Sequence, residues 1–409
     1  MTYPEVRALT ADEISDGVRV VGQGMLGRID EEVVEAWAAM WQPAECHGAF
    51  SSSGALVGIV RWFRDDVCVP GGTLPTAAVT AVAVLPTHRR QGHLTRLMNA
   101  QLEHIHRSGV PIATLVAAEW PIYGRFGYGP AMDACAYEID VAAARFRDGA
   151  TGSIELVSPA ELLPHLEGAH TARWSRTPGS LRRHPMVWER AAGVERWPGD
   201  ASEPGLLRGA IWRDDGGTVR GAVAHRVKDT WVRNRPAGTS EVTMLVGETP
   251  EAERELWRHL CSLDWIRTVT AGLRAVDDPL PLFLTDGRSA AQVERSDAIW
   301  ARIIDVPATF AARRATAPGR AVVQVDDPLG YADGRWAIEL SPEAGSATPT
   351  DQPAGTRMGI DALGSIYFGG HSPRRLADAG WLTELRAGAV DSLSGLLATP
   401  AAPWSTTSY

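Results

Sequence analysis

The chain has 409 residues, a formal net charge of −9 and a hydrophobic content of 44%, which is typical of a globular protein with a substantial core. Its length indicates more than one domain, at roughly 100–200 residues each. The net negative charge argues against general nucleic-acid binding and is compatible with cationic substrates. No apolar run approaches the roughly 18 residues of a membrane span, and the acidic N-terminus is unlike a signal peptide.

The cysteines and histidines predict no metal site. The four cysteines are widely spaced and form no CxxC pair: Cys46, Cys68, Cys135 and Cys261. Neither a disulfide framework nor a zinc site is therefore indicated. His104 and His106 are two residues apart on a predicted helix, so they face different sides of it. We expect a protein of the reducing cytoplasm that holds no metal.

Residues 1–148 predict a mixed α/β domain. Apolar positions spaced for helices alternate with short apolar runs typical of buried strands. The expected elements are helices within 11–42, two strands within 55–69, a buried strand over 76–85, a helix from Gln91 to about Arg107, a buried strand over 111–119 and a closing strand over 134–141.

The residue pattern changes at the segment DGATGS, residues 148–153, where we expect a domain boundary. We expect three domains, at 1–148, 149–295 and 296–409. The second repeats the element order of the first, with strands over 205–213, 221–227 and 240–246, a helix over 251–263 and a strand over 266–273. The third has expected strands over 299–305, 320–327 and 335–340, a polar loop over 341–355 and an aromatic-tipped tail over 400–409.

The sequence VLPTHRRQGHLTRLM, residues 84–98, predicts an anion site. A buried strand that runs through a tight turn into a helix leaves unpaired N–H groups at the positive end of the helix dipole. Gly92 allows close approach of a phosphate to the backbone, and Arg89 and Arg90 supply charge and forked donors. A solvated basic turn would have the same letters, but the order strand, turn, helix, buried strand favours a phosphate cradle. This turn is neither a Walker A loop nor a GxGxxG dinucleotide fingerprint.

The arrangement resembles the acetyl-coenzyme A motif of GNAT N-acetyltransferases, (Q/R)xxGx(G/A), which here spans Arg89 to Leu94. Leu94 departs from the glycine or alanine that is usual there. Together with PIYGRFGYGP at 121–130 and the three-part chain, the motif resembles one subfamily, the Eis (enhanced intracellular survival) acetyltransferases. This resemblance implies an α/β (α+β) fold with two tandem GNAT-like domains, the second degenerate, followed by a sterol-carrier-protein-like domain.

The same resemblance implies a set of residues around acetyl-coenzyme A. In this fold the strand before the motif splays, so that its backbone can pair with the pantetheine arm. The expected contacts are Val82, Ala83, Val84, Arg89, Arg90, Gln91, Gly92, His93, Leu94, Thr95, Ala118 and Glu119.

Transfer of an acetyl group from a thioester to an amine requires protonation of the departing thiolate. A tyrosine hydroxyl suits this role, and Tyr123 and Tyr128 are both candidates by position, although either could simply pack the core. The resemblance selects Tyr123 as the general acid. It also implies that the terminal carboxylate, here on Tyr409, acts as the base, whereas an ordinary C-terminus would be frayed.

The acceptor amine is expected to lie against the N-terminal helices. Carboxylates there suit polycations and an aromatic wall suits a cation, though a solvated acidic helix face would look the same. The residues concerned are Asp30, Glu31, Glu32, Glu35 and Trp37, of which Glu35 and Trp37 are our substrate-binding choices. The resemblance implies aminoglycoside-type polycations acetylated at several amines, with protein lysines as an alternative.

The second domain is expected not to bind coenzyme A. Its turn carries Glu248, Glu251 and Glu253 where the first domain carries arginines, so it would repel a diphosphate. The resemblance further implies a homohexamer. Two competing hypotheses are a non-catalytic acyl-coenzyme A sensor that kept the cradle and a lipid carrier centred on residues 296–409.

Overall fold

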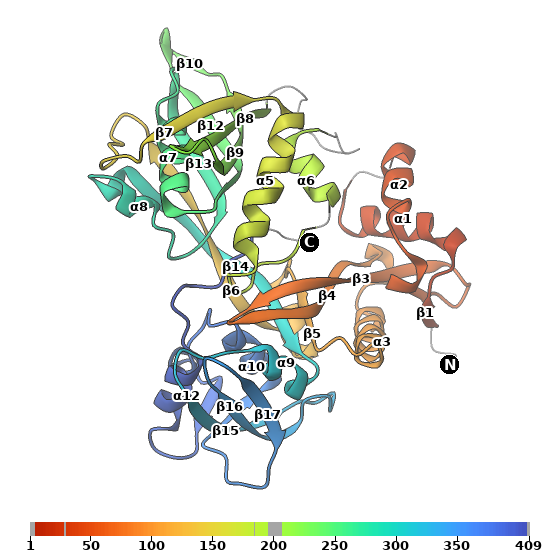
Figure 1. The fold of residues 1–409 in the computed structure, drawn as a ribbon. Helices are drawn as coiled ribbons and strands as arrows, with labels where there is room; N and C mark the ends of the chain where they lie inside the picture. The colour runs from red at the N-terminus through yellow and green to blue at the C-terminus, as the bar shows by residue number, and fades with distance from the viewer. Residues whose placement is uncertain (1–4, 28–29, 184, 195–206, 407–409) are drawn as a thin grey trace.

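The computed structural model describes residues 5–27, 30–183, 185–194 and 207–406. Their strands form a 12-stranded sheet, a five-stranded sheet and a two-stranded ribbon, and Figure 1 shows the large sheet joining the red-to-orange and green parts of the chain while the five-stranded sheet lies below, in blue. The expected mixed α/β architecture is confirmed. Within these ranges no helix is both long and apolar enough to cross a membrane.

The first part contains the elements that position the site. They are β1 (Val6–Ala8), α1 (Ile14–Gly24), α2 (Glu31–Ala38), β2 (Cys46–Phe50), β3 (Leu56–Val69), β4 (Gly72–Val84), α3 (His93–Arg107), β5 (Ile112–Leu115), α4 (Trp120–Tyr123) and β6 (Gly129–Asp140). Neighbouring residues of β3 face opposite sides of the sheet: Ile59 packs with α1 and α2, whereas Val60 packs with α3. The two helical layers therefore cover opposite faces of β2–β4.

The expectation of two strands within 55–69 is wrong. The polar residues Arg64 to Asp66 do not interrupt the strand, because they pair in register with β4 as part of one 14-residue strand. The reversal comes later, at Gly71, whose φ of +88° favours glycine.

The second part repeats the order of the first. Its elements are β7 (Gly152–Val157), α5 (Pro159–Trp174), α6 (Pro185–Ala192), β8 (Leu207–Asp214), β9 (Val219–Lys228), β10 (Trp231–Val232), β11 (Arg235–Pro236), β12 (Gly238–Gly247), α7 (Pro250–Cys261), β13 (Ile266–Arg274), α8 (Leu280–Phe283) and β14 (Ala290–Ile303).

The two parts exchange strands at the centre of the large sheet. The sheet order is β1-β2-β3-β4-β5-β14-β6-β13-β12-β9-β8-β7, so β14, which ends the second part, lies beside β5 of the first. In return β6 lies beside β13, and β6 and β14 pair with each other antiparallel. The strand expected over 299–305 at the start of the third domain therefore lies in the central sheet instead.

The third part packs on this exchanged pair. Its elements are α9 (Val306–Ala312), β15 (Gly319–Asp326), β16 (Gly334–Leu340), β17 (Gly345–Pro349), β18 (Thr356–Gly359), α10 (Ile360–Tyr367), α11 (Pro373–Asp378), β19 (Leu382–Glu384) and α12 (Ala389–Leu397). The segment 341–355, expected to be a polar loop, contains β17. Helix α10 lies so close to β6 that a Cβ on Gly129 would come within 1.9 Å of the Asp361 carbonyl oxygen. The fully buried pair Arg302–Asp327, at 3.0 Å, ties β14 to the loop after β15.

Candidate active site

Strands β4 and β5 part in the way that the coenzyme arm would require. They pair in parallel only from Thr76–Ile112 to Ala78–Thr114. Beyond Ala78, β4 continues to Val84 while no described strand pairs with it on the β5 side. Ala81, with a φ of +52°, makes the bulge at which this divergence occurs. Unpaired backbone groups on this edge can bind an extended amide-containing chain as another strand would.

The turn after β4 presents a run of backbone donors. A short 3-10 helix, η3 (Pro86–His88), leads into the loop, where Arg90 and Gly92 have left-handed φ values of +62° and +79°. Among the described residues, none accepts a hydrogen bond from the backbone N–H groups of residues 89–95. Consecutive free amides in such a turn form a concave anion site, and the start of α3 adds its positive dipole. The loop therefore has the donor set that a diphosphate needs.

The arginines of the loop have different tasks. Arg89 donates from Nη2 to the Gly24 carbonyl at 2.7 Å and from Nε to the Val84 carbonyl at 3.3 Å, so it fastens the loop to α1 and β4. The side chain of Arg90 is exposed and has no partner among the described residues. Arg96 donates to the Gln91 carbonyl at 3.3 Å and lies over the loop from the first turn of α3. Sequence reasoning missed Arg96, although its i+4 spacing from Gly92 was a usable signal.

The other expected contacts differ in exposure. Val82, Val84 and Leu94 are half-buried, Ala83 and His93 are buried, and Gln91, Thr95, Ala118 and Glu119 are exposed. Burial lowers the pKa of His93, so its imidazole is neutral and contributes no charge to the cradle. The exposed side chains after β5 and in the loop are within reach of a ligand from solvent.

The two tyrosines after β5 differ in how deeply they are buried. Tyr128 is fully buried, and its ring meets that of Tyr123 edge-on at 6.2 Å. Tyr123, at the end of α4, is 6% exposed, and its hydroxyl makes no hydrogen bond with any described residue. Burial raises the pKa of Tyr123 to about 12, with a smaller contribution from Glu119. Tyr123 therefore keeps its proton at neutral pH and has a hydroxyl free to donate it.

Some of the acidic residues expected to face the acceptor make structural contacts within the chain. Asp30 caps α2 by accepting from the Val33 amide at 3.3 Å, and Glu31 pairs with Arg19 at 2.7 Å. Glu35 is exposed, and Trp37 is half-buried against the cluster beneath α1 and α2. The described chain ends at Thr406, whose carbonyl accepts from Arg183. Tyr409 lies outside the described residues.

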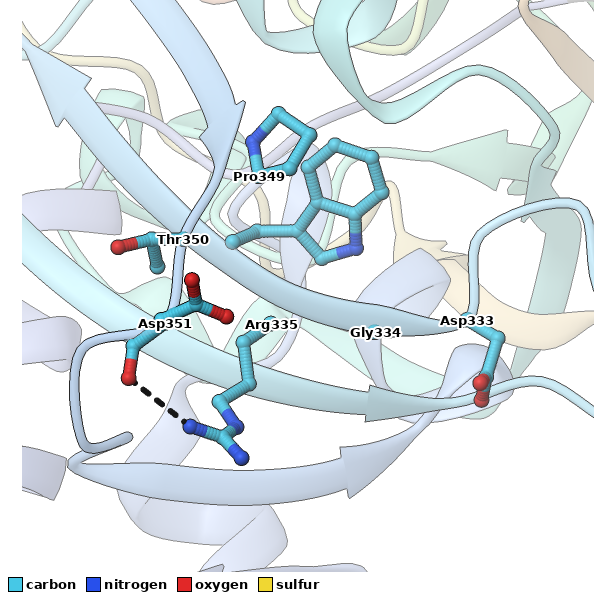
Figure 2. Close-up of a pocket in the computed structure, with 7 residues that line it drawn as sticks. Asp333, Gly334, Arg335, Pro349, Thr350 and Asp351 are labelled. Carbon is cyan, nitrogen blue, oxygen red and sulfur yellow. Dashed lines mark hydrogen bonds between the residues drawn. The ribbon is translucent and has the colours of Figure 1, made fainter.

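The third part contains a surface depression that includes none of these residues. Figure 2 shows the strip of β16 and β17 that lines it, where Arg335 donates to the Asp351 carbonyl at 3.1 Å. Its lining is mostly polar, so it does not resemble a lipid cavity. No group of His, Cys, Asp or Glu in the described ranges could hold a metal ion.

Family models match all three parts of the chain. Acetyltransferase (GNAT) domain models match residues 5–131 and 179–303, and a sterol carrier protein domain model matches residues 306–406. An uncharacterized N-acetyltransferase of Streptomyces griseus is 35% identical over 416 residues, covering 98% of each chain. N-acetyltransferase Eis of Mycobacterium bovis is 36% identical over 336 residues, covering 79% of this chain and 78% of that protein.

Solved structures agree with these matches. Eis1 of Mycobacterium abscessus superposes with a TM-score of 0.86 at 31% identity, over 99% of this chain and 100% of that one. A GCN5-related N-acetyltransferase of Anabaena variabilis has the same fold, with a TM-score of 0.85 at 20% identity over 99% of this chain and 100% of that one. The resemblance inferred from residues 84–98 and 121–130 is confirmed.

Proposed function

The chain belongs to the Eis family of GNAT N-acetyltransferases, and from that premise we propose that it transfers acetyl groups from acetyl-coenzyme A to primary amines of aminoglycoside-type polycations, at more than one position. Acetyltransferases of this fold take their acyl group from acyl-coenzyme A. The observation that carries the proposal is the free donor run of residues 89–95 beside the open edge of β4, with the Tyr123 hydroxyl near the end of β5.

The residues present fit the donor molecule. The loop amides and the charges of Arg90 and Arg96 suit a diphosphate. The edge of β4 beyond Ala78 has no described strand partner on the β5 side and suits the amides of pantetheine, although the Val84 carbonyl already accepts from Arg89. Acetyl-coenzyme A would supply the activated thioester. The residues of the chain bind and orient the substrates and donate or accept protons.

Tyr123 acts as the proton donor in this proposal. Its raised pKa, about 12, keeps it protonated but also above the pKa of a thiol, near 8.5. Complete transfer to sulfur would be uphill, so Tyr123 stabilises the departing thiolate chiefly by donating a hydrogen bond. The carboxylate of Tyr409 would take the proton of the acceptor ammonium, as the family resemblance implies.

The acceptor proposal rests on charge and shape. The net charge of −9 and the exposed Glu35 favour a cationic molecule, and Trp37 offers it an aromatic wall. Two alternatives remain: transfer to protein lysines, and coenzyme binding without catalysis. A small polyamine would be recognised by the same groups.

A panel of acceptors separates these alternatives. Thiol release and acetylated products would be measured with acetyl-coenzyme A and a set of aminoglycosides, a linear polyamine and a lysine-rich peptide. We expect turnover with aminoglycosides and products that carry more than one acetyl group. Turnover with the peptide alone would favour a protein acetyltransferase, and coenzyme binding without thiol release would favour a sensor.

We also propose a cytoplasmic homohexamer. All four cysteines are free thiols, which suits a reducing compartment. Light scattering after size-exclusion chromatography should give about six times the 44.0 kDa chain mass, and a monomer mass would overturn the hexamer.

A further inference from the structure

The second GNAT part has an opening laid out like the coenzyme cleft of the first. Strands β12 and β13 pair in parallel from Gly238–Ile266 to Val242–Ala271 and then part, and α7 follows β12 as α3 follows β4. In the first part the corresponding edge and helix start have free donors. In the second part the chain's own side chains occupy the same places.

Arg274 bridges the parted strands. Its Nη1 donates to the Leu245 carbonyl of β12 at 3.2 Å, and its Nε donates to Asp278 at 2.6 Å. Glu253, from the first turn of α7 and 2% exposed, pairs with Arg274 at 3.5 Å and also bonds to Arg173. Thr249 caps this helix by accepting from the Ala252 amide, whereas Gly92 leaves α3 uncapped. An anion would therefore meet a buried carboxylate here instead of free donors.

The C-terminal tail binds on top of this network. The ring of Trp404, 4% exposed, packs against the guanidinium groups of Arg173 and Arg274, whose carbons are 5.0 and 4.9 Å from its centroid. Its Nε1 donates to the Leu273 carbonyl of β13 at 2.6 Å, and its backbone N–H donates to the Pro178 carbonyl at 2.8 Å. This is a built peptide site: a buried aromatic anchor with two cations against its ring and both N–H groups satisfied.

Hydrogen bonds before and after Trp404 fix the course of the tail backbone. Before it, the Ala402 amide donates to Asp277 at 2.7 Å, and after it Arg183 donates to the Thr406 carbonyl.

Residues 178–182, which contact the tail, are hydrogen-bonded to β3. The Gly179 amide donates to the Cys68 carbonyl, and the Cys68 amide donates to the Ser180 carbonyl, both at 2.8 Å. The amide of Arg182 donates to the Asp66 carbonyl at 2.9 Å. The tail is therefore held by a segment that is fixed to β3 of the catalytic part.

We propose that the degenerate GNAT cleft is a clamp for the C-terminal tail and that Trp404 is a positioning residue, which restricts where the terminal carboxylate can lie during acetyl transfer. The catalytic half of this inference rests on the proposed function; the docking half does not. A released tail would sample many conformations, so the carboxylate would lie near the acceptor amine for a smaller fraction of the time.

The test uses the full chain and three variants. Trp404→Ala removes the anchor, and Trp404→Phe keeps a ring against the arginines but loses the Nε1 donor. Trp231→Ala removes an exposed tryptophan elsewhere and is the matched control. Amide hydrogen exchange of residues 402–406 reports docking. Coenzyme Kd, amine KM and kcat report the effect on transfer.

We expect Trp404→Ala to raise exchange at 402–406 and to lower kcat at least tenfold, with coenzyme Kd within twofold of the starting protein. Trp404→Phe should be intermediate in both readouts and carries the test if the alanine variant does not fold; Trp231→Ala should change neither. Unchanged exchange in both Trp404 variants would overturn the clamp. Raised exchange with unchanged kcat would overturn the positioning role. If the starting protein itself showed no transfer activity, the proposed function would be overturned, and the exchange result alone would decide whether the clamp exists.

Discussion

Substitution of Gly92 by alanine tests the phosphate cradle most specifically. Gly92 has a φ of +79°, and a Cβ there would come within 3.3 Å of Arg96 Nη1. Gly109, at the other end of α3, has a φ of +67° and nothing within 4 Å of a Cβ. Each alanine would therefore carry a left-handed backbone penalty of about 1–2 kcal/mol, but only the one at position 92 would enter the cradle.

The two variants should thus be similar in stability and different in binding. Gly92→Ala would displace the Arg96 guanidinium and hold the donor run away from a phosphate. We expect coenzyme affinity to fall at least tenfold, which corresponds to about 1.4 kcal/mol. Gly109→Ala should leave the affinity unchanged.

Isothermal titration with acetyl-coenzyme A would give the Kd of each variant, and thermal unfolding without ligand would compare their stability. The reasoning is refuted if Gly92→Ala binds as tightly as the starting protein. It is also refuted if both variants lose affinity equally, because backbone strain and not the cradle would then be responsible.

Three further outcomes follow from the site. The pKa of Tyr123 is raised to about 12, so its protonated form persists below that pH; the kcat profile should show no fall between about pH 9 and 11, where an ordinary tyrosine titrates, and a fall there would show an unshifted acid. Trp37→Ala should raise the KM of a polycationic acceptor roughly 2- to 30-fold, the range of about 0.5–2 kcal/mol for a cation–π contact, whereas the exposed Trp265→Ala should not; equal effects would remove Trp37 from the acceptor site. Calorimetry should give one coenzyme per chain, because Glu253 and Arg274 fill the second cleft, and two per chain would contradict that occupancy.

The local parts of the site could be predicted from sequence because strand, turn and helix there are consecutive. The order of residues 76–123 was enough to place the loop at the start of α3 and Tyr123 after β5. Spacing alone left both Tyr123 and Tyr128 open, and the choice of Tyr123 came from the family resemblance; in the structure Tyr123 is 6% exposed and Tyr128 is fully buried.

The long-range parts could not be predicted in this way. The apolar residues of β6 and β14 indicate strands, but a strand pattern does not say which strand is the neighbour, so the exchange of partners between the two GNAT parts could not be read from either. Arg89 was expected to face the diphosphate, but its side chain reaches the Gly24 carbonyl, 65 residues away in sequence. The anchor role of Trp404 depends on Arg173 and Arg274, which only the folded chain brings together.

The most direct test of the central claim compares thiol release by the starting protein and by Tyr123→Phe, with acetyl-coenzyme A and an aminoglycoside acceptor. The account predicts acceptor-dependent release that falls roughly 10²- to 10⁴-fold in the variant, while coenzyme Kd stays within twofold. Equal turnover by the two proteins would contradict the role of Tyr123, and acceptor-independent or undetectable release by the starting protein would contradict amine acetylation itself.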